Sequence, residues 1–133
     1  MKLATHGVCS IFLTFILLGV APIDAFFIVA MMAGAVAPDI LEALTRVKHR
    51  SKIFHNYLAA FILLFLGLWE SWILGLGLGC LHHLVLDMTT KKGVFFFDKR
   101  LHGMLKTNEP IDNLAIIGLH AALAMPIMMG IVA

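Results

Sequence analysis

The 133 residues are 61% hydrophobic, with a mean hydropathy of +0.97, and only 14% of them are charged. A water-soluble domain of this length could not cover so much apolar surface, so the composition excludes an ordinary soluble fold and predicts an integral membrane protein. The net charge of +2 is too small to indicate nucleic-acid binding. One membrane-embedded helical domain, covering residues 1–133, is the natural arrangement at this length.

Five apolar stretches follow one another along the chain and predict an all-α fold, an integral membrane bundle of about five short helices. The stretches cover residues 7–21, 25–38, 57–69, 72–86 and 111–133. A proline or a charged residue breaks the chain at each boundary: Pro22, Pro38, Glu70, Asp87 and Pro110. The first four stretches are shorter than the ~20 residues of a perpendicular span, so they either reach the headgroup region or insert partly.

The first stretch has a second interpretation. Lys2, the apolar run 8–20 and the sequence from Ala21 to Ala25 resemble a secretory signal with an A-x-A-like end. Another apolar run follows at once, which favours a membrane helix.

Basic residues are confined to three places: Lys2, the loop 46–52 and the loop 91–106. With five spans, these places share one face of the membrane, whereas the opposite turns carry Asp24 and Glu70. The positive-inside rule then predicts a multi-pass protein of the cell membrane, with the N-terminus and the basic loops in the cytoplasm. Re-entrant or interfacial hairpins would leave the sidedness of these loops unchanged. The lipid bilayer is therefore the predicted partner.

His83 and Asp87 form the clearest site pattern. They are four residues apart, so on a helix both side chains lie on one face, one turn apart. An imidazole and a carboxylate so placed can reach the same metal ion. The alternative is a histidine at a helix end followed by an aspartate that begins a loop.

The five-span topology places further candidate ligands at the same cytoplasmic ends as this pair. The full set is His6, Asp39, His49, His55, His83 and Asp87. Three or four such groups converging would suit Zn²⁺, and Mn²⁺ or Fe²⁺ is an alternative.

Two charged residues are candidates for catalysis. Glu42 could be a further ligand or a general base, and the alternative is a solvated carboxylate paired with Arg46 at i+4. Arg50 could bind phosphate oxygens bidentately, and the alternative is a role in fixing the topology.

Four residues in the apolar stretches predict contacts between helices. His120 predicts a helix-to-helix hydrogen bond inside the last stretch. Gly75, Gly77 and Gly79 predict a close approach of neighbouring helices to the fourth stretch.

The order of these motifs resembles the YdjM-like family of small, membrane-bound, predicted metal-dependent hydrolases. The matching residues are Thr5-His6, Pro38-Asp39, His49-Arg50, His55, and His83, Asp87, Thr90 and Gly93 in the block GCLHHLVLDMTTKKG. Leu41 departs from the family, which usually has a second acid there, and the interval from His49-Arg50 to His55 is one residue longer. The short chain and its opening residues are also similar to small archaeal and archaeal-virus membrane proteins.

The resemblance implies a hydrolase that uses a metal-activated water. A distant similarity to all-helical zinc phospholipase C and nuclease enzymes implies phosphoester cleavage, including cleavage of a lipid headgroup at the cytoplasmic face. In this interpretation Arg50 would be the phosphate clamp and His49 a further ligand or a supporting group, and the remaining ligands would be His6, Asp39, His55, His83 and Asp87. The alternative is a non-enzymatic small membrane protein with a structural or degenerate metal site.

Overall fold

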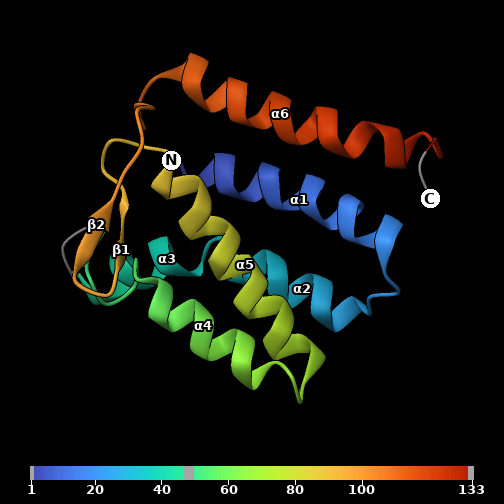
Figure 1. Ribbon diagram of the computed structural model, residues 1–133, viewed down its shortest axis with the longest axis horizontal. Helices are drawn as coiled ribbons and strands as arrows, with labels where there is room; N and C mark the ends of the chain where they lie inside the picture. The colour runs from blue at the N-terminus through green and yellow to red at the C-terminus, as the bar shows by residue number, and fades with distance from the viewer. Residues whose placement is uncertain (1, 47–49, 132–133) are drawn as a thin grey trace.

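The fold comes from a computed structural model that describes residues 2–46 and 50–131. Six helices and a two-stranded sheet lie within these residues (Figure 1). The helices are α1 (Leu3–Val20), α2 (Ala25–Gly34), α3 (Ala37–Thr45), α4 (Tyr57–Leu66), α5 (Ser71–Met88) and α6 (Pro110–Met128), and the strands are β1 (Val94–Phe96) and β2 (Lys99–Leu101). The chain is mostly helical, as predicted, but the expected number of about five helices is wrong by one.

The additional helix arises because the second apolar stretch breaks. α2 ends at Gly34, α3 begins at Ala37, and the two axes are bent by 51°. Pro38 occupies the first turn of α3, where its missing N–H leaves no intrahelical hydrogen bond unmade. The proline therefore starts a new helix near the point where the sequence predicted an end.

The basic loop 91–106 contains an ordered hairpin that the all-α prediction missed. β1 and β2 are antiparallel, with Val94 opposite Leu101 and Phe95 opposite Arg100. The Arg100 guanidinium lies 4.8 Å from the centroid of the Phe95 ring, a cation–π contact that fixes the cation against the sheet. Three-residue strands carry too little hydrophobic pattern to be recognised in a sequence.

Helix α5 occupies the centre of the fold and packs against α2 and α4 (Figure 1). A Cβ atom on Gly75 or Gly79 would collide with the carbonyl oxygen of Phe27 or Met31 in α2. On the other side, a Cβ on Gly77 would lie 2.9 Å from the Leu64 nitrogen in α4. The predicted role of these glycines in close helix packing is confirmed.

Helices α1 and α6 run side by side (Figure 1), and a histidine pair joins α5 to α6. The Nε2 atoms of His82 and His120 are 3.1 Å apart, which confirms the predicted helix-to-helix hydrogen bond. His120 Nδ1 lies 2.9 Å from the carbonyl oxygen of Ile116, an atom that can only accept. With both rings neutral, His120 Nε2 is therefore the acceptor and His82 Nε2 the donor.

Replacing His120 with leucine is expected to lower the free energy of unfolding in detergent by about 1 kcal/mol, because His82 loses its acceptor. Thermal unfolding followed by circular dichroism measures the change. The exposed His102 provides the matched control, His102→Leu. Equal unfolding curves for the two variants would contradict the proposed contribution of this bond.

Three helices, α1, α5 and α6, are long and apolar enough to cross a membrane. If the bent pair α2–α3 is counted as one span, up to four spans are present among the described residues. Only 11% of the 18 most apolar residues of α6 are buried within the protein, so most of its side chains are exposed or half-buried. These helices are consistent with a membrane protein. The ten residues of α4 extend about 15 Å, half of a ~30 Å hydrocarbon core, so α4 by itself is too short to cross the membrane, which agrees with the partial insertion that the sequence left open.

The polar ends of the helices gather at one end of the molecule. The starts of α1, α4 and α6, the end of α5 and the β1–β2 hairpin all lie on the left of Figure 1, and the C-terminus lies on the right. The shared end follows from the alternating directions of consecutive segments, and it determines where the candidate site forms.

Candidate metal centre

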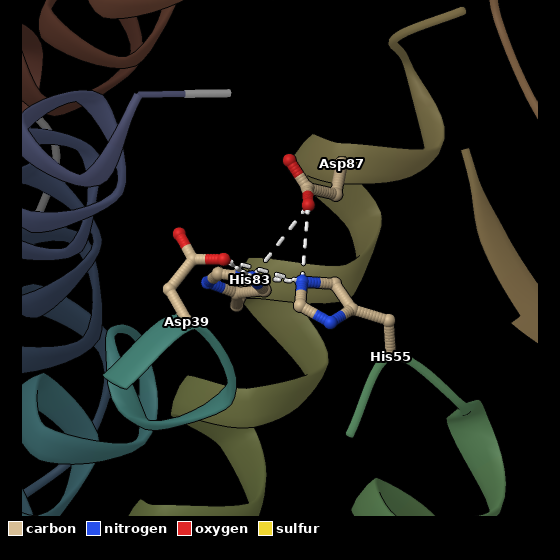
Figure 2. Close-up of side chains that lie close together, drawn as sticks. All are labelled: Asp39, His55, His83 and Asp87. Atoms are coloured by element: carbon tan, nitrogen blue, oxygen red, sulfur yellow. Dashed lines mark hydrogen bonds and ion pairs between the residues drawn. The ribbon is translucent and has the colours of Figure 1, made fainter. Parts of the chain in front are cut away.

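Four side chains converge where α3, α5 and the loop before α4 meet: Asp39, His55, His83 and Asp87 (Figure 2). One potential ligand atom from each lies within 4.8 Å of all the others. The side chains of both histidines are 0% exposed and that of Asp87 is 1% exposed, whereas that of Asp39 is 15% exposed. Asp39 is therefore the most exposed of the four side chains, although its Oδ1 atom is itself buried.

The distances between these atoms fit one coordination sphere. His55 Nε2 lies 3.2 Å from His83 Nε2, 3.3 Å from Asp39 Oδ1 and 3.4 Å from Asp87 Oδ2. His83 Nε2 lies 3.8 Å and 3.7 Å from the same two carboxylate oxygens. Metal–ligand bonds of about 2.1 Å in a tetrahedron separate ligand atoms by about 3.4 Å. The four residues could therefore hold one metal ion.

His83 is oriented by the break between α2 and α3. Its Nδ1 atom donates to the carbonyl oxygen of Ala35 at 2.8 Å, because a carbonyl can only accept. This bond fixes the tautomer and turns the Nε2 lone pair toward the cluster. His83 and Asp87 lie on the same face of α5, as the i, i+4 spacing predicted.

His55 is oriented by a carboxylate on its other side. Its Nδ1 atom donates to Glu42 Oε1 at 2.9 Å, so Nε2 faces Asp39 and Asp87. Burial by itself lowers the pKa of His55, but the nearby carboxylates of Asp39, Asp87 and Glu42 outweigh it and raise the pKa to about 9. Below that pH the metal-free site holds a proton that a divalent cation would displace.

Glu42 also holds the loop that carries His55. Its carboxylate accepts hydrogen bonds from the backbone N–H groups of Arg50 and Ser51, each at 2.6 Å, and from the Ser51 hydroxyl at 3.0 Å. Glu42 is 3% exposed, so the alternative of a solvated loop carboxylate is wrong. Glu42 contacts the ring nitrogen of His55 that points away from the cluster, so it positions a candidate ligand.

Arg50 lies behind Asp87 and is 3% exposed. Its NH2 atom donates to Asp87 Oδ1 at 2.7 Å, and NH1 donates to the Thr90 hydroxyl at 2.6 Å and to the Gly93 carbonyl at 3.2 Å. Arg50 therefore balances the buried charge of Asp87 and joins the loop to the end of α5. Its Nε atom is buried without a hydrogen-bond partner among the described residues.

His6 lies beside the cluster but outside the group of four. Its Nε2 atom is 3.2 Å from Asp87 Oδ1, and its ring stacks on that of His83 with centroids 3.9 Å apart. His49 lies outside the described residues. The structure thus brings five of the six predicted ligands together and separates them into a group of four and a neighbour.

The polar atoms of the cluster fit a bound cation. Asp39 Oδ1 is buried and, within the described part of the chain, has no partner in hydrogen-bonding geometry. Buried carboxylate oxygens are normally paired or ligate a metal. Two imidazoles and two carboxylates form a donor set that Zn²⁺, Mn²⁺ and Fe²⁺ all accept. The donor set therefore supports a divalent cation without selecting the element.

Two contacts of the site have no signal in the sequence. The carbonyl of Ala35 becomes a partner of His83 only through the break after α2, and the hydroxyl of Ser51 reaches Glu42 only through the fold of the loop. Thr90 and Gly93 were singled out by the family resemblance, and both contact Arg50.

Comparisons with protein-family models, with curated proteins and with solved structures give no significant match to this chain. The resemblance to the YdjM-like family therefore stays a prediction.

Proposed function

We propose that Asp39, His55, His83 and Asp87 hold a divalent cation, for which Zn²⁺ is the first choice and Mn²⁺ or Fe²⁺ the alternative. The observation that carries the proposal is the spacing of the four ligand atoms, which all lie within 4.8 Å of one another. The hydrogen bonds from His83 to Ala35 and from His55 to Glu42 support it, because both leave Nε2 directed at the same point.

We further propose that the chain is a membrane-bound metal-dependent hydrolase. The cation would lower the pKa of a water molecule and polarise a phosphoryl oxygen. Asp39 is the most exposed of the four side chains, so water and substrate would enter on its side. Glu42 would keep His55 in position, and Arg50, which is buried beside Asp87, would hold Asp87 ionised.

A phosphorylated substrate, including a lipid headgroup, is supported by a hollow beside the end of α5. The hollow has a volume of about 490 Å³ and is lined by Met88, Thr89, Arg100, Leu101, His102 and Gly103. Its first residue directly follows Asp87 in the chain. The segment 88–106 carries five Lys or Arg residues and one acid, a charge balance that attracts phosphate at the predicted cytoplasmic face.

The test is phosphodiester hydrolysis by the purified full chain in detergent, with bis(p-nitrophenyl) phosphate and phosphatidylglycerol as substrates and with Zn²⁺ or Mn²⁺ added. Activity should fall at least about 100-fold in Asp39→Asn, because loss of a ligand charge weakens the site more than loss of a supporting residue does. Asp98→Asn is the matched control, since the Asp98 side chain is 92% exposed. A metal-loaded protein that cleaves neither substrate would contradict the hydrolase proposal.

The second candidate is a non-enzymatic membrane protein with a structural metal site. The observation that favours it is the set of four protein ligands at near-tetrahedral spacing, because structural zinc sites are closed by four protein ligands. In that case Asp39→Asn would lower thermal stability and metal content together, with no hydrolysis by the parent protein.

A further inference from the structure

The two oxygens of Asp87 face different partners. Oδ2 lies 3.4 Å and 3.7 Å from the Nε2 atoms of His55 and His83. Oδ1 lies 3.2 Å from His6 Nε2 and accepts a hydrogen bond from Arg50 at 2.7 Å. Figure 2 shows the two oxygens pointing apart, with Oδ2 toward the histidines and Oδ1 away from them. Asp87 thus has the arrangement of a carboxylate that bridges two positions.

Among the described residues, no hydrogen bond of good geometry accounts for the burial of His6. It is 0% exposed, and both of its ring nitrogens lack a hydrogen-bond partner among the described residues. A buried imidazole normally finds a donor or acceptor for each nitrogen, or it ligates a metal. Its Nε2 atom lies 3.2 Å from Asp87 Oδ1, close to the separation of about 3.4 Å between two ligands of one tetrahedral ion.

The stacking of His6 on His83 means that the two rings do not share one ion. A metal bound to an imidazole lies in the plane of the ring. The two rings are inclined by only 20° with centroids 3.9 Å apart. The two ring planes therefore stay separate at the distance from a ring nitrogen at which a metal ion would bind. A cation in the plane of His83, at the position between Asp39, His55 and Asp87, therefore lies out of the plane of His6.

We infer that His6 and Asp87 Oδ1 form a second cation position next to the first, with Asp87 as the bridge. The inference rests on the proposed function, which supplies the first position. Asp39 would contribute to the second position as well, because Figure 2 shows its other oxygen turned away from the histidines, as Asp87 Oδ1 is. A carboxylate oxygen has two lone pairs, so Arg50 and a cation can both contact Oδ1. A borderline or hard divalent ion such as Zn²⁺ or Mn²⁺ suits this nitrogen and carboxylate set.

The test uses the full chain in detergent, loaded with Mn²⁺ and freed of excess metal. Elemental analysis is expected to give two equivalents, and the electron paramagnetic resonance spectrum is expected to show the exchange coupling of two neighbouring Mn²⁺ ions. His6→Ala should bind one equivalent and give the uncoupled spectrum of an isolated ion. Asp98→Ala, which removes an exposed carboxylate, should behave as the parent does.

One equivalent with an uncoupled spectrum in the parent would overturn the second position and leave the first intact. No bound metal in the parent would overturn the first position, and the proposed function with it. The parent spectrum decides between these outcomes by itself, so the test stands even if His6→Ala fails to fold.

Discussion

Replacing His83 with alanine is expected to abolish tight binding of a divalent metal. His83 supplies a nitrogen whose direction is fixed by Ala35, and without it the cluster keeps only one nitrogen ligand, that of His55. Asp87→Asn should have a similar effect, since an amide removes the negative charge of the ligand and leaves the buried Arg50 without a compensating charge. Metal content by elemental mass spectrometry, on protein purified gently and reloaded, measures the result.

A smaller loss of metal binding is expected when the residue that positions His55 is changed. Glu42→Gln keeps the size of the side chain that positions His55 but removes its charge, and is expected to weaken metal binding by roughly 10–100-fold. The exposed variant His102→Ala should retain the parent affinity. Equal metal content in His83→Ala and the parent would contradict the proposed site, and equal losses in Glu42→Gln and His83→Ala would make Glu42 a ligand.

Gly79→Ala is expected to destabilise the fold more than any other glycine-to-alanine change in α5. The new Cβ would meet the carbonyl oxygen of Met31, and it would lie 2.8 Å from the backbone nitrogen of Ala35. Both are backbone atoms, so α2 and α5 must separate, at a cost of about 3 kcal/mol or more for an overpacked contact. The measurement is the thermal unfolding curve in detergent.

The matched control is Gly118→Ala in α6. A Cβ at Gly118 meets nothing within 4 Å, so this variant should unfold at or above the parent temperature. Ala35 is the residue whose carbonyl holds His83, so Gly79→Ala should also lower metal content. A Gly79→Ala protein as stable as Gly118→Ala would contradict the close approach of α2 to α5.

The residues of the site could be predicted because their chemistry and their topology agree. His83 and Asp87 lie at helical spacing, and alternating helix directions bring Asp39 and His55 to the same end. The division between His6 and the other four could not be predicted, because it depends on the stacking of two rings. Sequence spacing fixes which end of a helix a side chain occupies, and it leaves open which neighbour the ring contacts.

Parts of the fold were missed for a similar reason. The bend after α2 places Pro38 in a first turn, and proline is equally compatible with ending one helix and starting another. The hairpin depends on pairing between short strands, in which Phe95 lies opposite Arg100. Glu42 fits a solvated helix face by its spacing from Arg46, and it is buried because the loop after α3 returns over it.

The four ligands of the cluster come from segments that are synthesised far apart in time. Asp39 precedes the loop that carries His55, and His83 and Asp87 come last, near the end of α5. If the chain inserts as it is synthesised, the earlier segments would enter the bilayer before Asp39 has its partners. A cation that binds once α5 is complete would link α3, the loop before α4 and α5. Maturation of the protein would then depend on the supply of metal after insertion.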